Sequence, residues 1–210
     1  MFDQITIIGC GLIGSSLLRA INKKKLSKKV NAFDKSKEVS LFIKDNLSVN
    51  ACNDINDSVK DSDLIIICTP LSSYKDILLS IKSSLKQNVI LTDTGLTKKE
   101  INKVVSSLNL KNISWIASHP IAGTEYSGPE AGFAELFENR WCILSSEDQK
   151  QKEKLEILKN FWEAIGSKVK FMTFEDHDNV LALTSHLPHA IAYSIVRTVI
   201  NNDHKFKDEI

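Results

Sequence analysis

Short apolar runs alternate with amphipathic stretches over the first two thirds of the chain. Apolar runs of four or five residues with polar boundaries are typical of strands that are buried on both faces of a parallel sheet. Between them, apolar residues recur every three or four positions, which predicts helices. The predicted strands are 5–9, 30–34, 64–68, 89–93 and 113–117, and the predicted helices are 12–22, 74–85 and 98–108. The alternation predicts an α/β fold with a doubly wound parallel sheet.

The last third of the chain has a different, mainly helical pattern. Its predicted elements are a helix at 149–165 that ends at Gly166, a strand at 168–172, and one long helical stretch from Glu175 to about Asn201 that only Pro188 interrupts. We therefore expect two domains. Residues 1–172 form the sheet domain, and residues 173–210 form the start of an all-helical C-terminal domain, which we expect to be truncated.

Composition narrows the function classes. The chain has 210 residues, of which 42% are hydrophobic and 25% are charged, as in ordinary globular proteins. The formal net charge is 27 − 26 = +1, which argues against nucleic-acid binding through bulk positive charge. No apolar run approaches the roughly 20 residues of a membrane span. The N-terminus enters a strand without a basic leader, and no two of the four cysteines are close in sequence. We expect reduced thiols and a cytoplasmic location.

The sharpest local motif is Gly9-Cys10-Gly11-Leu12-Ile13-Gly14, which follows the first predicted strand and opens the first predicted helix. In a dinucleotide site, the first glycine permits a tight turn, and the second lets the backbone approach a pyrophosphate. The third glycine allows the helix to pack closely on the strand. The free N–H groups of the helix N-terminus then bind the phosphates. This motif predicts a Rossmann-type nucleotide site.

Asp34 strengthens this prediction because it lies 20 positions after Gly14, at the end of the next predicted strand. A carboxylate there accepts hydrogen bonds from the adenosine ribose hydroxyls and repels a 2′-phosphate. We therefore expect NAD as the cofactor, with NADP disfavoured. Lys35 follows directly and weakens that preference.

Two further strand ends are candidates for contact with the cofactor, because the carboxyl ends of parallel strands form the ligand crevice. Thr69 and Pro70 follow the predicted strand 64–68 and are expected to line the ribose or the nicotinamide. Asp93-Thr94-Gly95 ends the next strand. A simple strand-ending turn explains either segment equally well.

Histidines supply the candidate chemistry. His119 follows the predicted strand 113–117, where a neutral imidazole would accept a proton from a substrate hydroxyl as hydride leaves the same carbon. His177, His186 and His189 lie in the long helical stretch. No two of them have the i, i+4 spacing of a helical zinc pair, so we expect a polar pocket and no metal.

These motifs together resemble the prephenate/arogenate (cyclohexadienyl) dehydrogenase family of tyrosine biosynthesis. The similarity covers essentially the whole chain, in order. The matching segments are Gly9–Gly14, Asp93-Thr94-Gly95, His119-Pro120-Ile121-Ala122-Gly123-Thr124-Glu125 with Gly128, Asn139-Arg140, His177-Asp178 and Ser185-His186-Leu187-Pro188-His189.

The resemblance implies an NAD-dependent oxidative decarboxylation of prephenate, of arogenate, or of both. It implies that His119 accepts the proton of the ring hydroxyl while carbon dioxide leaves the opposite ring carbon. Thr124, Glu125 and His189 would line the substrate pocket, and His186 would support it together with His177. The family also implies a homodimer through the helical domain, with apolar residues after Asp178 as its contact face. These residues are Leu181, Ile191, Ile195 and Val199.

The sequence departs from the family at two points. Leu96 occupies the position at which the family usually has a serine that contacts the catalytic histidine. The family also has an arginine for the substrate carboxylate in a segment after the long helix, which we expect to lie beyond Ile210. Among the three arginines of the chain, Arg140 has the most plausible location for this role, with a structural ion pair as the alternative. Two other functions stay open. One is a different NAD-dependent hydroxy-acid dehydrogenase, although the long helical stretch has no lysine to serve as its base. The other is a non-catalytic NAD-binding or redox-sensing module.

Overall fold

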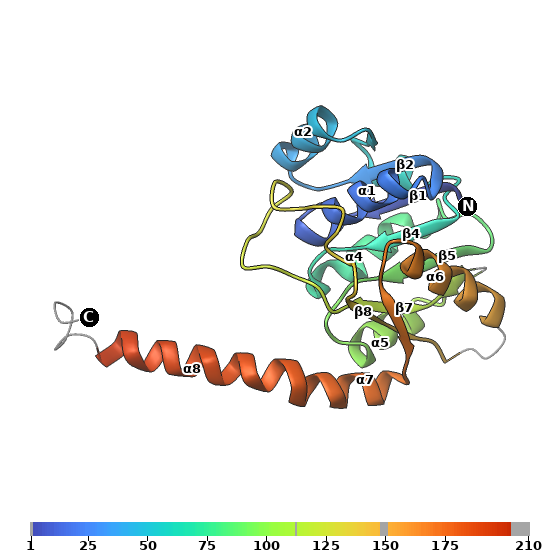
Figure 1. The fold of residues 1–210 in the computed structure, drawn as a ribbon. Coiled ribbons are helices and arrows are strands. Elements are labelled where there is room, and N and C mark those ends of the chain that lie inside the picture. Colours follow the sequence, from blue (N-terminus) through green and yellow to red (C-terminus); the bar gives the residue numbers. More distant parts are fainter. Residues whose placement is uncertain (1, 112, 148–150, 203–210) are drawn as a thin grey trace.

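A computed structural model of the chain describes residues 2–111, 113–147 and 151–202. The elements of its main sheet and the helices between them are β1 Phe2–Ile8, α1 Leu12–Lys24, β2 Ser27–Phe33, α2 Lys37–Asn46, β3 Asn50–Ala51, α3 Ile55–Val59, β4 Leu64–Ile67, η1 Leu71–Ser73, α4 Tyr74–Ile81, β5 Val89–Asp93, α5 Lys99–Ser107 and β6 Ile113–Trp115. All six strands are parallel, in the order β3-β2-β1-β4-β5-β6 (Figure 1). This is the strand order of dinucleotide-binding sheets, so the predicted fold class is confirmed.

Alternate residues of the central strands enter two separate cores. In β4, Leu64 and Ile66 pack in the core that α1 and α6 (Lys152–Ala164) cover. Ile65 and Ile67 pack in the other core, together with residues of α4 and α5. All four side chains are fully buried. The unbroken apolar run in β4 therefore reflects a strand with helices on both faces.

A second, smaller sheet continues from the first, and the sequence did not predict it. Its strands are β7 Ala117–Pro120, β8 Trp141–Ser145 and β9 Lys168–Phe171. The predicted strand 113–117 is wrong at its C-terminal end, because the chain changes partner after Ile116. The Ile116 N–H still donates to Leu91 in β5, whereas Ala117 already pairs with Ser145 in β8. An apolar run shows that a strand is buried, but it does not show which neighbour the strand pairs with.

The C-terminal helical stretch is divided differently from the prediction. It consists of α7 Phe174–Leu181, a π-helical turn η3 Ala182–His186, and α8 Leu187–Asn202. Pro188 does not interrupt the helix but is the second residue of α8. Proline lacks an N–H and crowds the carbonyl four residues before it. The wider π turn directly before Pro188 accommodates this conflict.

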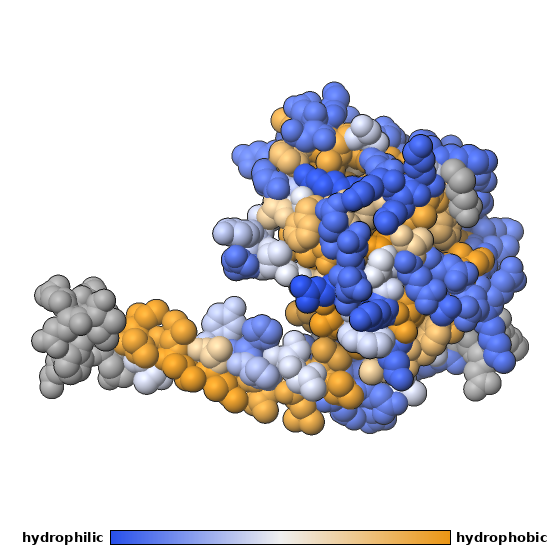
Figure 2. All heavy atoms as spheres, viewed as in Figure 1, coloured by the Kyte–Doolittle hydropathy of each residue, from blue (hydrophilic) through white to orange (hydrophobic). Residues whose placement is uncertain are grey.

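Helix α8 projects away from the body of the molecule and carries a long apolar surface (Figures 1 and 2). Ile191, Ile195 and Val199 are all more than half exposed. Leu181, which was predicted to share this surface, is instead buried because it belongs to α7, which packs on the body. No helix within the described ranges is long and apolar enough to cross a membrane. The division into domains after residue 172 stays a prediction.

Candidate active site

The glycine motif forms a tight turn between β1 and α1. Gly9 has a φ of +90°, which L-residues rarely adopt. A Cβ atom on Gly14 would overlap the carbonyl oxygen of Gly9, so the third glycine is required for the helix to start this close to the strand. In contrast, a Cβ on Gly11 would meet nothing within 4 Å. No side chain of the described residues caps the N-terminus of α1, so its first N–H groups have no side-chain partner there.

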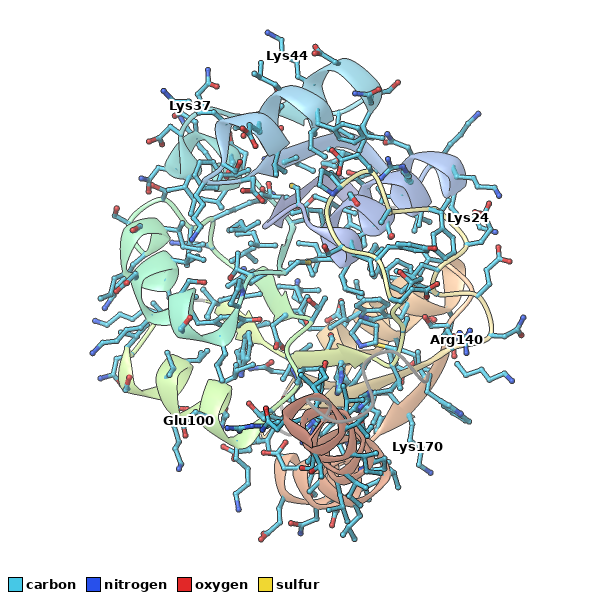
Figure 3. The ribbon with its side chains drawn as sticks, turned by 90° about the vertical axis from the view of Figure 1, so that its left-hand side faces the viewer. Lys24, Lys37, Lys44, Glu100, Arg140 and Lys170 are labelled. Carbon is cyan, nitrogen blue, oxygen red and sulfur yellow. The ribbon has the colours of Figure 1, made fainter. Side chains whose placement is uncertain are left out.

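Asp34 lies directly against this turn, as its position at the end of β2 predicted. Its Oδ2 accepts a hydrogen bond from the Cys10 N–H at 2.7 Å, and its Oδ1 accepts one from the Ser36 N–H at 2.9 Å. Beside it lies a groove of about 450 Å³ between β2, β3 and α2. Lys35 and Lys37 line this groove, and Figure 3 shows Lys37 and Lys44 on the α2 side of the molecule.

The end of β4 meets the same turn. A Cβ atom on Gly9 would lie only 2.6 Å from the methyl carbon of Thr69, which is closer than two non-bonded carbon atoms can approach. The Thr69 hydroxyl accepts a hydrogen bond from Ser73, and Pro70 is exposed. Burial is the main cause that raises the pKa of the neighbouring Cys68 thiol to about 12, which leaves it protonated and unreactive. Thr69 and Pro70 therefore lie where the sequence predicted, and contact with a cofactor stays a prediction.

The Asp93-Thr94-Gly95 segment contains a buried ion pair that the sequence analysis did not anticipate. Lys98 Nζ lies 2.6 Å from Asp93 Oδ2, and both side chains are fully buried. The Asp93 carboxylate also accepts hydrogen bonds from the N–H groups of Gly95 at 2.8 Å and Ser118 at 3.0 Å. Asp93 therefore joins β5, the loop before α5 and β7 into one rigid unit.

His119 is part of β7, opposite Ile143 of β8, and is 4% exposed. Its Nδ1 lies 2.8 Å from Nε2 of His177, and Nδ1 of His177 lies 2.7 Å from Oδ1 of Asp178. Burial, assisted by the cation of Lys98, lowers the pKa of His119 to about 3. No described residue makes a hydrogen bond to Nε2 of His119. This neutral imidazole is thus suited to accept a proton from a bound hydroxyl.

The other predicted substrate residues fall into two groups. His186 is close enough to His119 to affect its pKa, and its buried Nε2 has no hydrogen-bond partner among the described residues. Thr124, Glu125 and His189 are exposed, and His189 donates its Nδ1–H to the Ser185 carbonyl at 2.7 Å. The structure therefore brings His119 and His186 together and leaves the remaining three at the surface.

The segment after His119 returns to the first turns of α1, the helix that the glycine turn opens. The Phe133 N–H donates to the Ser16 hydroxyl at 3.1 Å, and Arg19 donates to the Pro129 carbonyl at 3.1 Å. Arg140 is exposed and its guanidinium has no ion-pair partner among the described residues. Within those residues, no three His, Cys, Asp or Glu side chains are arranged to hold a metal.

Comparison with known families decides between the enzyme classes. Residues 17–171 match the nucleotide-binding domain of prephenate dehydrogenase, and residues 173–209 match the dimerization domain of the same family. The chain belongs to the prephenate dehydrogenase family. The resemblance inferred from the glycine, His-Pro and Ser-His-Leu-Pro-His motifs is confirmed, and the chain is classed with the NAD-dependent oxidoreductases of tyrosine biosynthesis.

Individual members of the prephenate dehydrogenase family are similar over most of this chain. The cyclohexadienyl dehydrogenase of Zymomonas mobilis is 39% identical over 100% of the chain and 72% of that protein. The prephenate dehydrogenase of Bacillus subtilis is 30% identical over 98% of the chain. A crystal structure of the Aquifex aeolicus prephenate dehydrogenase with hydroxyphenyl propionate and NAD+ has a TM-score of 0.86 and 27% identity, over 96% of this chain and 71% of that chain. The chain spans 56% of the Bacillus protein, about half its length.

Sequence reasoning missed the role of Lys98 and the direct contact between His177 and His119. Lys98 follows the Asp-x-Gly turn by three residues, but a lysine in a polar loop gives no sign of burial. His177 is 58 residues from His119, so no local pattern connects them. The adjacent pair His177-Asp178 was the one available signal, because a carboxylate next to a histidine is a common orienting arrangement.

Proposed function

We propose that this chain catalyses the NAD-dependent oxidative decarboxylation of prephenate to 4-hydroxyphenylpyruvate, of arogenate to tyrosine, or of both. The observation that carries this proposal is His119, a buried and neutral histidine whose Nε2 has no hydrogen-bond partner among the described residues. The second feature is the glycine turn, where no side chain of the described residues caps the N-terminus of α1. Together these features supply a proton acceptor and a place for a hydride acceptor.

The residues of the glycine turn fit a dinucleotide. The space beside Gly11 and the free N–H groups of α1 suit a pyrophosphate, with Leu12 and Ile13 forming the first turn of the helix. Asp34 suits the adenosine ribose and disfavours a 2′-phosphate, which supports NAD over NADP. When bound, NAD supplies the hydride acceptor of the reaction.

The chain itself supplies orientation and proton transfer. His119 accepts the hydroxyl proton at Nε2, and the nearby Lys98 cation opposes protonation of the imidazole before substrate arrives. His186, whose buried Nε2 has no hydrogen-bond partner among the described residues, supplies a further contact to the substrate in this proposal. Thr124, Glu125 and His189 complete the pocket in this proposal. Little further acid–base chemistry is required, because loss of carbon dioxide produces an aromatic ring.

The test is the rate of NADH formation, measured by absorbance with purified protein, NAD+ and either prephenate or arogenate. We expect turnover with at least one substrate. The His119→Asn variant should lose about 10²- to 10⁴-fold in kcat, the range of a general base, and should keep its NAD+ affinity. Tight NAD+ binding without turnover on either substrate would contradict the proposal and favour a redox-sensing module.

Two further parts of the proposal concern assembly and location. The match of residues 173–209 to a dimerization domain suggests a homodimer. We infer that α8 supplies its contact surface, since Ile191, Ile195 and Val199 are exposed along one groove of the helix. A cytoplasmic location stays a prediction that rests on the sequence pattern of the cysteines.

A further inference from the structure

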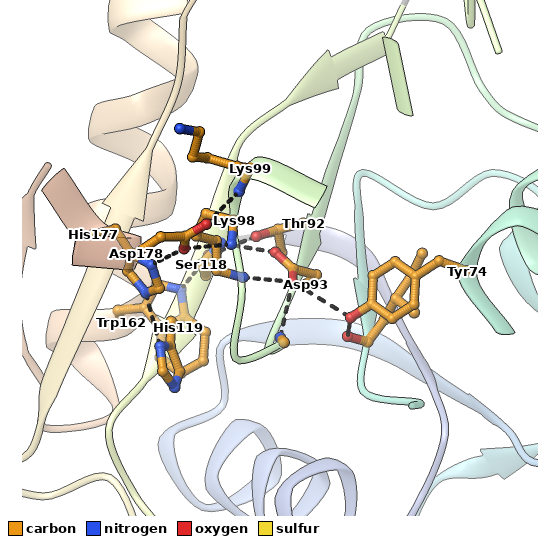
Figure 4. Close-up of polar contacts among 12 residues, drawn as sticks. Tyr74, Thr92, Asp93, Lys98, Lys99, Ser118, His119, Trp162, His177 and Asp178 are labelled. Carbon is orange, nitrogen blue, oxygen red and sulfur yellow. Dashed lines mark hydrogen bonds and ion pairs between the residues drawn. The ribbon is translucent and has the colours of Figure 1, made fainter. Parts of the chain in front are cut away.

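A chain of polar contacts links the N-terminus of α5 to His119. Asp178 in α7 accepts hydrogen bonds from the N–H groups of Lys98 at 2.8 Å and Lys99 at 3.0 Å, one on each carboxylate oxygen. The Oδ1 atom of Asp178 also lies 2.7 Å from Nδ1 of His177, whose Nε2 lies 2.8 Å from Nδ1 of His119. Figure 4 shows this chain in one view.

The direction of each hydrogen bond in this chain follows from its first member. Two backbone N–H groups point at the Asp178 carboxylate, which must therefore act as an acceptor. Burial opposes its ionisation, but the N–H groups of Lys98 and Lys99, together with His177, lower the pKa of Asp178 below its usual value. The carboxylate therefore accepts the Nδ1–H of His177.

The same logic continues to His119. Burial lowers the pKa of His177, so its ring is neutral and carries one proton, which Nδ1 uses toward Asp178. Nε2 of His177 is then an acceptor, and the facing Nδ1 of His119 must donate to it. The neutral ring of His119 is left with its lone pair on Nε2, the nitrogen that has no partner among the described residues.

We propose that Asp178 and His177 are positioning residues that hold His119 in the tautomer with an unprotonated Nε2, so that docking of α7 on α5 prepares the proton acceptor. This inference rests on the proposed function of His119 as a base. Helix α7 lies in the segment that matches the dimerization domain, whereas His119 lies in the segment that matches the nucleotide-binding domain. In this proposal the first segment therefore sets the tautomer of a histidine in the second.

The series of hydrogen bonds from Asp178 to His119 also affects the charge that His119 can carry. The Lys98 cation from the loop before α5 opposes a positive charge on His119, whereas the Asp178 carboxylate from α7 favours one. Lys98 is itself paired with Asp93 of β5. When His119 takes a proton from the substrate, the Asp178 carboxylate is therefore the group that stabilises the new imidazolium through His177.

The test uses the full chain with nitrogen-15 labelled histidine, in which NMR chemical shifts distinguish a protonated ring nitrogen from a bare one. We expect wild-type His119 to show a bare Nε2 and a protonated Nδ1, with its signals assigned by their loss in His119→Asn. His177→Gln keeps a donor toward Asp178 and an acceptor toward His119, and should preserve this tautomer. His177→Phe removes the acceptor and should give a mixture of tautomers.

Turnover provides the second readout. We expect His177→Phe to lower kcat about tenfold, the factor that one hydrogen bond of about 1.4 kcal/mol contributes, with unchanged NAD+ affinity and partial recovery in His177→Gln. Asp176→Asn is the matched control because this neighbouring carboxylate bonds Thr173 and no histidine. It should behave as the wild type in both readouts.

A protonated Nε2 on His119 in the wild type would overturn the inference, and so would an unchanged tautomer and rate in His177→Phe. The wild-type spectrum decides the direction of the bonds even where His177→Phe fails to fold. Failure of the proposed function has a different signature. The wild-type protein would then give no turnover with either substrate, or His119→Asn would keep the wild-type rate, whatever tautomer the spectra show.

Discussion

The two glycines Gly11 and Gly14 should respond in different ways to the addition of a single methyl group. Both lie in the turn between β1 and α1, and in the sequence they belong to one motif. At Gly14 a Cβ would overlap the carbonyl oxygen of Gly9 and lie 3.0 Å from its carbonyl carbon. At Gly11 the same atom meets nothing within 4 Å, and the backbone angles, φ −67° and ψ −157°, lie just beyond the edge of the extended region that alanine prefers.

The magnitudes follow from these contacts. Carbon atoms in proteins pack at about 3.5–4.0 Å, so Gly14→Ala would force the turn open by roughly half an ångström or more. Overpacking a rigid site with one methyl group costs about 1–3 kcal/mol, and a clash with backbone belongs at the upper end. For a chain of this length that corresponds to a fall in Tm of about 6–12 °C. Gly11→Ala should instead change the stability by no more than about 0.5 kcal/mol, because the methyl group meets no atom and the restriction of the unfolded chain offsets the small backbone strain.

NAD+ binding should be affected more by Gly11→Ala than by Gly14→Ala, the reverse of the order for stability. If a pyrophosphate approaches the backbone at Gly11, the methyl group of Gly11→Ala occupies its place, and NAD+ affinity should fall at least about tenfold, or 1.4 kcal/mol. Thermal unfolding gives the stability and isothermal titration with NAD+ gives the affinity. Unchanged NAD+ affinity in Gly11→Ala would refute the cofactor assignment of the turn. A Gly14→Ala protein as stable as the wild type would refute the steric reasoning.

Two further substitutions test the electrostatics of the site. Asp34→Ser should raise the affinity for NADP+ relative to NAD+ by about tenfold, because it removes the carboxylate and leaves Lys35 and Lys37 in the groove. An unchanged ratio of the two dissociation constants would argue against ribose recognition by Asp34. The free energy of unfolding should fall as the pH decreases from 6.5 toward 3. In this range His119 binds a proton in the unfolded chain but not in the folded chain, where its pKa is about 3. Urea unfolding at about pH 7 and about pH 5 should show a weaker pH dependence in His119→Asn, and an equal dependence in both proteins would contradict the low pKa.

Much of the nucleotide-binding half could be predicted from sequence because its signals are local. The apolar runs of β4 and β5 lie on single strands, and the β5 prediction of 89–93 coincides with Val89–Asp93. The spacing from Gly14 to Asp34 spans one helix and one strand, so the chain geometry alone brings the carboxylate to the glycine turn. The family motifs are likewise contiguous segments.

The second sheet and the contacts around His119 depend instead on distant residues. The change of partner at Ile116 is decided by β8, some 25 residues later, and β8 itself has an exposed tryptophan at its start and no alternating pattern. The burial of Lys98 depends on Asp93 and on the docking of α7. A lysine in a sequence is expected at the surface, because burying an unpaired ammonium group is costly. The sequence pattern does not show when a buried carboxylate will pair with the lysine and offset that cost.

Leu96 cannot form a hydrogen bond to His119, which makes the contact between His119 and His177 more important. The resemblance noted in the sequence places Leu96 where a serine would be expected to contact the histidine. The Leu96 side chain is 64% exposed and has no hydrogen-bonding group. The next hydroxyl, Thr97 Oγ1, is buried without a partner among the described residues. The loop before α5 therefore offers His119 no side-chain hydrogen bond. The bond to His177 on the opposite ring nitrogen is the contact that remains to orient the base. The orientation of the proposed proton acceptor, His119, thus depends on α7, whereas the conformation of the glycine turn, the proposed nucleotide site, depends on β1 and α1.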